Sequence, residues 1–175
     1  MMISTDDLYV FDKHSSAVLH ADFTFDSQYI QTNCQAGELL FVDLKRGSQL
    51  TSLSKIANYN NLIDLDAEDD ASKAAFWDSQ TCVFGWSVQG IWTPGADYSD
   101  INALDVDPKK KYIATADDNG LVKIYRYPCV QSGSKSVECI GHSSHVTCVR
   151  WCIDNTLISV GGNDRTMCIW DIEER

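Results

Sequence analysis

The sequence predicts an all-β chain, a partial WD-repeat β-propeller with roughly four blades of antiparallel strands. Three observations support this fold class. Short β-rich segments alternate with turn signals, the pattern recurs in several copies, and the last copy opens with Gly-His and closes with Trp-Asp. That signature is typical of a repeat of about 40 residues that forms four short strands. A hydrophobic content of 44% over 175 residues is enough to build a packed core.

The clearest repeat lies between Gly141-His142 and Trp170-Asp171. Inside it, an alternating stretch, a short apolar run and a second β-rich stretch follow one another. Turn-forming residues separate these stretches, as expected between antiparallel strands. We therefore expect strands at residues 145–151, 157–160 and 166–170.

Two similar repeats precede the last one. In the nearer copy Tyr125 stands in place of the tryptophan, and the farther copy begins at His14-Ser15-Ser16. Residues 1–13 are interpreted as the remnant of a preceding blade, and residues 14–175 as propeller blades that form part of a ring. Stacking is what stabilises such repeats. The strands expected in the two copies are 100–106, 111–116 and 121–125, and 17–25, 29–33, 39–43 and 49–53, with a closing strand at 8–12.

Two segments between the copies depart from this pattern. Residues 81–92 are aromatic and strand-like. We expect Trp77, Trp86 and Trp92 in the core, because aromatic side chains dominate buried β surfaces. Residues 58–73 are polar and acidic, which predicts an exposed loop.

The strongest polar constellation is structural. In WD repeats a His, a Ser or Thr, an Asp and a Trp can form a hydrogen-bond chain within one blade. His142, Asp164 and Trp170 occupy three of these places. Val160 is assigned to the fourth place, so the chain of bonds is expected to be broken or bridged by water. A His–Asp pair also occurs in nucleophilic triads, but turn and strand positions of a repeat favour the structural role, and no catalytic residue is assigned.

One pattern of metal-binding residue types is present. Cys139, His142, His145 and Cys148 are evenly spaced and have the donor types that zinc prefers. They fall across a strand, a turn and another strand, and are expected to diverge. The acidic run beginning at Asp64 lacks the Gly and Glu that a calcium loop requires at its sixth and twelfth positions. We therefore predict no metal ion and no cofactor.

Charge and cysteine usage limit the function classes. The formal net charge is −11, from 14 basic and 25 acidic residues, which opposes binding to nucleic acid phosphates and to anionic membranes. No segment reaches the roughly 18 apolar residues of a membrane span. The seven cysteines are scattered and several alternate with apolar residues. They are interpreted as small buried side chains in a reducing compartment, the cytoplasm.

With these strands placed, the sequence resembles the echinoderm microtubule-associated-protein-like family from about residue 14 to residue 172. The most specific matches are Gly90-Ile91-Trp92 and Tyr127-Pro128-Cys129. Further matches extend over 81–85, 93–97, 100–103, 116–118, 142–147, 157–159 and 161–162. The resemblance implies the C-terminal end of a tandem-propeller region.

The family resemblance also implies a function. Members are cytoplasmic proteins of the microtubule cytoskeleton, and their propeller region is linked to tubulin binding. We therefore expect a non-enzymatic scaffold located in the cytoplasm and cytoskeleton, whose partners are tubulin or microtubules. The alternative is a general WD-repeat adaptor with a different protein partner. The loop residues expected to contribute to partner binding are Ser143, Ser144, His145, Asn163 and Arg165.

Overall fold

A computed structural model describes residues 9–52 and 77–173 of the chain. The described residues form three antiparallel sheets. The first sheet contains β1 (Val18–Phe23), β2 (Tyr29–Cys34), β3 (Leu39–Asp43) and β4 (Ser48–Leu50). The second contains β5 (Ile101–Val106), β6 (Tyr112–Asp117), β7 (Leu121–Arg126) and β8 (Val137–Ile140). The third contains β9 (Val146–Trp151), β10 (Thr156–Gly161) and β11 (Met167–Asp171).

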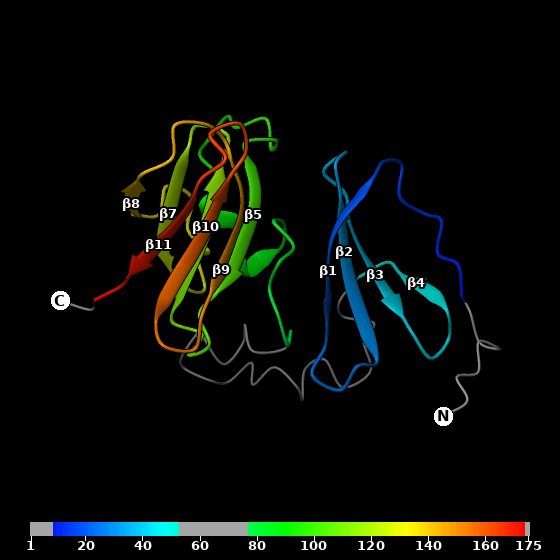
Figure 1. The fold of residues 1–175 in the computed structure, drawn as a ribbon. Coiled ribbons are helices and arrows are strands. Elements are labelled where there is room, and N and C mark those ends of the chain that lie inside the picture. Colours follow the sequence, from blue (N-terminus) through cyan, green and yellow to red (C-terminus); the bar gives the residue numbers. More distant parts are fainter. Residues whose placement is uncertain (1–8, 53–76, 174–175) are drawn as a thin grey trace, which may run out of the picture.

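Within each sheet the strands pair in chain order, as in propeller blades. The second and third sheets pack against each other mainly through β5, β6 and β9. The first sheet stands beside them, and part of the chain between residues 77 and 100 lies between the first sheet and the other two sheets (Figure 1). These features confirm the all-β, partial-propeller fold that the repeats predict.

The second sheet is central because both of its faces are covered. Toward the third sheet it presents Ala103, Ala114 and Ala116, which pack with Val149 and Leu157. Alanine side chains allow the two sheets to approach closely. Each fully buried Val or Leu side chain contributes roughly 1.5–3 kcal/mol, so this interface is a main source of stability.

The other face of the second sheet packs against residues 83–92. Leu104, Ile113 and Tyr125 contact Val88 and Trp92 in one buried cluster. The expectation that residues 81–92 form a strand is wrong: the 3-10 helix η2 (Trp86–Ile91) lies there. At Gly90, whose N–H donates to Cys129 O at 2.7 Å, an added Cβ would meet the backbone oxygens of Cys129 and Gln131. This close backbone approach favours a helical turn that places apolar side chains inward.

The three tryptophans of this region differ in burial. Trp77 and Trp92 are buried, as expected, and Trp92 Nε1 donates to Val83 O at 3.0 Å. Trp86 is 45% exposed, so its assignment to the core is wrong. It occupies the first position of η2, whose buried residues are Ser87, Val88, Gly90 and Ile91.

A buried carboxylate ties residues 79–82 to the first sheet. Asp22 on β1 is 0% exposed and accepts hydrogen bonds from the backbone N–H groups of Thr81 and Cys82, both at 2.8 Å. Gln31 Nε2 and Ser79 Oγ also donate to it. Asp105 occupies the matching place on β5 and accepts from Trp151 N at 2.7 Å. An aspartate that accepts hydrogen bonds from backbone N–H groups therefore links both β1 and β5 to the chain beside them.

The first strand of each sheet is called its inner strand: β1, β5 and β9. Each inner strand carries one β-bulge at the same place. The extra residues are Leu19 on β1, Asn102 on β5 and Thr147 on β9. A bulge bends its strand and redirects the side chain of the extra residue. Three equivalent bulges are strong structural evidence for a true repeat.

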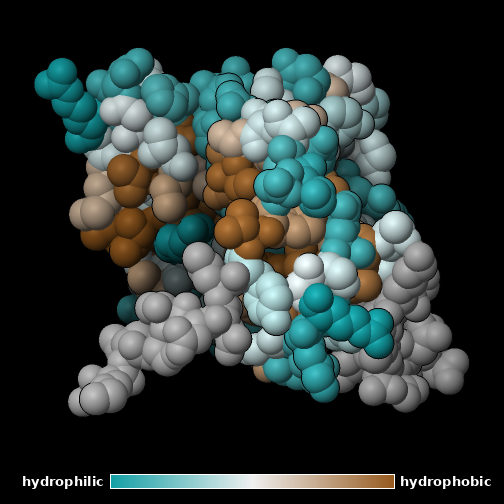
Figure 2. Space-filling model, turned by 90° about the vertical axis from the view of Figure 1, so that its right-hand side faces the viewer, coloured by the Kyte–Doolittle hydropathy of each residue, from teal (hydrophilic) through white to brown (hydrophobic). Residues whose placement is uncertain are grey.

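The surface on the side of the first sheet combines hydrophobic areas at mid-height with hydrophilic rims (Figure 2). Val18, Leu19 and Phe23 of β1 are exposed apolar side chains.

The acidic loop expected at 58–73 lies outside the described residues, as does most of the remnant expected at 1–13. Residues 9–13 of that remnant contain no strand. No helix among the described residues is long and apolar enough to cross a membrane.

Candidate functional site

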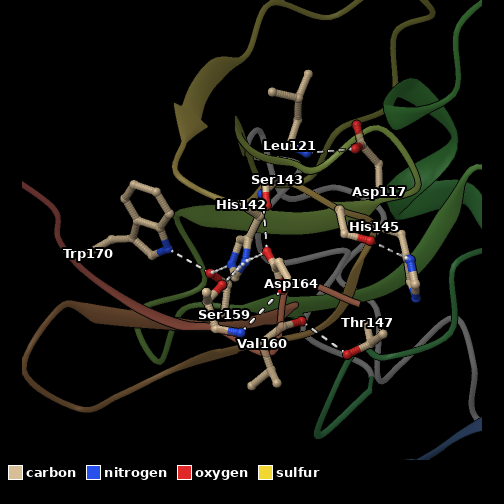
Figure 3. Close-up of polar contacts among 12 residues, drawn as sticks. Asp117, Leu121, His142, Ser143, His145, Thr147, Ser159, Val160, Asp164 and Trp170 are labelled. Atoms are coloured by element: carbon tan, nitrogen blue, oxygen red, sulfur yellow. Dashed lines mark hydrogen bonds and ion pairs between the residues drawn. The ribbon is translucent and has the colours of Figure 1, made fainter. Parts of the chain in front are cut away.

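A buried polar network organises the third sheet. His142, in the loop before β9, lies 3.0 Å from Asp164 Oδ2 through Nδ1 and 2.7 Å from Ser159 Oγ through Nε2. Trp170 Nε1 donates to the same Ser159 oxygen at 2.8 Å (Figure 3). The structure therefore brings together His142, Asp164 and Trp170, as the sequence predicts.

The assignment of Val160 to the fourth place is wrong. Ser159 fills it and closes the network, so no bond is missing. Val160 lies one residue further along β10, where its side chain points away from the histidine and is 41% exposed (Figure 3). Alternate residues of a strand face opposite sides, which explains why an error of one position changes the conclusion.

Asp164 is held as a carboxylate by its donors. Burial alone would raise the pKa of Asp164, but hydrogen bonds from the Thr166 N–H, His142 and the Thr166 hydroxyl lower this pKa to about 2. The N–H of Ser143 also donates to Asp164 Oδ2, at 3.1 Å. Asp164 thus connects the loop after β10 to the loop before β9.

Ser159, His142 and Asp164 have the contacts of a nucleophilic triad, but the surroundings differ. Ser159 is 0% exposed, and its Oγ accepts a hydrogen bond from Trp170. A substrate carbonyl cannot reach an oxygen enclosed in this way. We therefore assign these residues to the internal bracing of the blade.

A groove of about 460 Å³ lies where the inner strands of the three sheets approach one another. The bulged residues Leu19, Asn102 and Thr147 all line it, together with His145. Asn102 Nδ2 donates to Val146 O at 2.9 Å and to Asp118 Oδ1 at 2.7 Å. The three bulges therefore direct one apolar and two polar side chains into one shared hollow.

Aromatic rings form one wall of the groove. Phe84 and Tyr98 line it and also line a second hollow of about 470 Å³ on their other side. Phe84 stacks on Trp92 with ring centroids 5.6 Å apart, and Tyr98 meets Trp92 edge-on at 5.3 Å. Tyr98 is 58% exposed. These contacts fix a rigid apolar wall next to the polar groups of the bulges.

The predicted partner-binding residues lie in two neighbouring loops. Ser143, Ser144 and His145 precede β9, whereas Asn163 and Arg165 lie in the turn between β10 and β11. Ser143, Asn163 and Arg165 are exposed. His145 alone among the five lines the groove. The groove itself carries no linear sequence signature, and a matching of the three repeats would have been needed to find Leu19 and Asn102.

The evenly spaced cysteine and histidine pattern does not converge. Both ring nitrogens of His142 are occupied within the blade network, and His145 Nδ1 lies 3.1 Å from Ser144 Oγ. Cys139 and Cys148 lie on β8 and β9, in different sheets. The expectation of no metal ion at these four residues stays a prediction.

Fold, repeated bulges and the His-Ser-Asp-Trp network together define a WD-repeat β-propeller protein. A family model described as the second β-propeller of echinoderm microtubule-associated protein matches residues 61–172, which is more than half of the chain. The chain belongs to the echinoderm microtubule-associated-protein-like family.

Individual relatives agree with this membership. The chain is 37% identical over 163 residues to echinoderm microtubule-associated protein-like 4 of Homo sapiens, covering 93% of this chain and 15% of the relative. It is 36% identical to echinoderm microtubule-associated protein-like 2 of Homo sapiens and 34% identical to echinoderm microtubule-associated protein-like 3 of Mus musculus. Each comparison covers 91% of this chain. The chain spans 22% of the former relative's length and 16% of the latter's.

Solved structures support the fold alone. The computationally designed Ika4 protein is 16% identical in sequence and superposes with a TM-score of 0.58 over 97% of this chain and 100% of its own.

Proposed function

We propose that this chain is a non-enzymatic scaffold of the microtubule cytoskeleton in the cytoplasm, and that it binds soluble tubulin through the groove and its rim loops. The observation that carries the proposal is the convergence of three equivalent bulges on one groove. Membership in the family supports tubulin as the partner, because the relatives are named microtubule-associated proteins.

The groove has the chemistry of a protein-binding surface. Leu19, which is 54% exposed, offers an apolar contact, and Thr147 and His145 add polar groups nearby. Polar groups held by the scaffold give specificity at little entropic cost. A volume of about 460 Å³ accommodates a few side chains of a partner loop.

Charge disfavours binding of this chain to the assembled lattice. The chain carries a net charge of −11, and the family resemblance implies a strongly acidic lattice surface. Like charges suppress encounter and lower affinity, most of all at low salt. We therefore expect this chain alone to bind microtubules weakly or not at all.

The test compares a soluble-tubulin pull-down with microtubule co-sedimentation. Leu19→Asp is expected to weaken capture of soluble tubulin about tenfold, which corresponds to about 1.4 kcal/mol. Ile153→Asp is the matched control, because Ile153 is 92% exposed and lies in the turn between β9 and β10, away from the groove. Its capture of tubulin is expected to match that of the unmodified chain.

Three results would contradict this proposal. Co-sedimentation with microtubules at micromolar affinity in low salt would defeat the electrostatic argument. Equal loss of tubulin capture in both variants would remove the groove from the binding surface. Failure to capture soluble tubulin would favour the alternative, a WD-repeat adaptor with a different protein partner.

A further inference from the structure

A second polar cluster lies in the first sheet, outside the His142 network, and one of its members, Cys34, also lines the groove. His14, Cys34 and Glu38 each place one metal-ligating atom within 4.8 Å of the other two. Cys34 Sγ donates to Glu38 Oε2 at 3.1 Å, and His14 Nδ1 lies 3.5 Å from the same oxygen. The three residues come from the loop before β1, the end of β2 and the turn before β3.

The cluster arises from two local departures from the last blade. Cys34 pairs with Val18 as Gly161 pairs with Val146, so a thiol occupies a place where the last blade has no side chain. The turn after Cys34 is also shorter than the turn after Gly161. The Cys34 N–H donates to Glu38 O, four residues on, whereas the Gly161 N–H donates to Thr166 O, five residues on. The shorter turn brings the Glu38 carboxylate back over the thiol.

The His14 ring supplies an independent observation. Nε2 lies 2.7 Å from Thr32 Oγ1, which fixes the ring orientation. The side chain is 5% exposed, and Nδ1 is a buried atom with no hydrogen-bond partner among the described residues. A buried ring nitrogen without a hydrogen bond is unfavourable, and the orientation of Nδ1 toward a thiol and a carboxylate suits a bound cation.

We propose that His14 Nδ1, Cys34 Sγ and Glu38 form a three-ligand site for zinc or a similar divalent transition metal. Imidazole, thiolate and carboxylate are the three donor types that zinc uses in proteins. Tetrahedral zinc with bonds of 2.0–2.3 Å separates its donor atoms by about 3.3–3.6 Å. The Sγ–Oε2 and Nδ1–Oε2 separations of 3.1 and 3.5 Å lie within a few tenths of an ångström of these values, and Nδ1 and Sγ lie within 4.8 Å of each other.

The surroundings of the three ligands suit coordination. Thr32 holds the far nitrogen of His14, and Ser15 donates to Glu38 Oε1 through Oγ and to Oε2 through N–H, both at 2.9 Å. Such hydrogen bonds orient metal ligands. The Glu38 side chain is 35% exposed, which leaves room for a water molecule as fourth ligand. On binding, the Cys34 thiol loses its proton to solvent and the thiolate coordinates the metal.

The experiment titrates the reduced full chain with Co²⁺ and Zn²⁺ under anaerobic conditions. Co²⁺ bound to a thiolate gives a near-ultraviolet charge-transfer band that carboxylate-bound Co²⁺ lacks. We expect this band to saturate at one equivalent and to disappear when Zn²⁺ is added. Cys34→Ser is expected to abolish the band and to weaken Zn²⁺ binding at least ~100-fold, more than loss of a partner that only orients a ligand.

Two further variants keep the test decisive. Glu38→Gln changes a partly exposed side chain and is expected to weaken Zn²⁺ binding at least ~10-fold while the circular dichroism spectrum stays unchanged. Cys148→Ser, in the evenly spaced pattern, is the matched control and is expected to leave binding within about twofold. No saturable cobalt–thiolate band, a band retained by Cys34→Ser, or a band lost only in Cys148→Ser would each overturn the site.

Discussion

The first and last sheets contain the same kind of network, built from different residues. In the last sheet His142 contacts Ser159 and Asp164, and Trp170 completes the set. In the first, His14 contacts Thr32, and Glu38 accepts the Ser15 N–H just as Asp164 accepts the Ser143 N–H. Val42 stands at the tryptophan place of the first sheet, because Thr32 pairs with Leu40 as Ser159 pairs with Cys168.

This difference separates the geometry of a blade from its sequence signature. The first sheet keeps the histidine, the hydroxyl and the carboxylate, although it lacks both the Gly-His and the Trp-Asp pairs. Loss of the tryptophan leaves the hydroxyl with one polar partner in place of two. We therefore expect the hydroxyl of the last sheet to contribute more to stability than that of the first.

The largest expected effect is that of Ser159→Ala. The substitution leaves a buried His142 nitrogen and the Trp170 Nε1 without a partner, at about 1–3 kcal/mol each. We expect a loss of about 3 kcal/mol in the free energy of unfolding, measured by urea denaturation with an unchanged m-value. Ser159→Thr keeps the hydroxyl and is the control. A loss below about 1 kcal/mol would show that the network does not brace the blade.

A smaller effect is expected for Thr32→Val in the first sheet. This substitution keeps the side-chain shape and removes one hydroxyl, which contacts only the Nε2 of His14 in this network. We expect a loss of about 1–2 kcal/mol in the same urea experiment, because one buried nitrogen, in place of two, is left without a partner. A cost equal to that of Ser159→Ala would contradict the comparison of the two sheets.

The sequence predicted those parts of the molecule that local chemistry determines. Alternation and turn residues located most of the expected strands, although none forms at residues 9–12, and the Gly-His and Trp-Asp pairs located His142 and Trp170. The choice of Val160 over Ser159 was wrong because a β-strand alternates its faces with a period of two. A one-residue error therefore exchanges buried and exposed positions. The bulge at Thr147, which shifts the pairing of β9 with β10, leaves no mark in the residue pattern.

Other parts of the fold depend on contacts between distant residues. η2 forms where the chain packs on the second sheet, although residues 81–92 are rich in residues that favour strands. The His14 network did have a local signal, because His14-Ser15-Ser16 repeats His142-Ser143-Ser144. Its carboxylate could not be located in this way, since Glu38 follows a shorter turn than the one that contains Asp164.

The smallest expected effect concerns acid, and it compares the two carboxylates. Hydrogen bonds from the Ser15 N–H, the Cys34 thiol and the Ser15 hydroxyl lower the pKa of Glu38 from 4.5 to about 2. Against the opposing effect of burial, the donors around Asp164 lower its pKa from 3.8 to about 2. A carboxyl whose pKa is lower in the folded state stabilises the fold above its unfolded pKa and loses this contribution as pH falls.

The Glu38 contribution should therefore decline from about pH 4.5 toward pH 2, and that of Asp164 from about pH 3.8 toward pH 2. Urea midpoints measured across this range should fall less steeply for Glu38→Gln and for Asp164→Asn than for the unmodified chain. Between pH 4.5 and 3.8, Glu38→Gln should differ in slope more than Asp164→Asn, because the unfolded chain binds more protons at Glu38 than at Asp164 there. Identical slopes for the three proteins would show that neither carboxylate is stabilised by its donors.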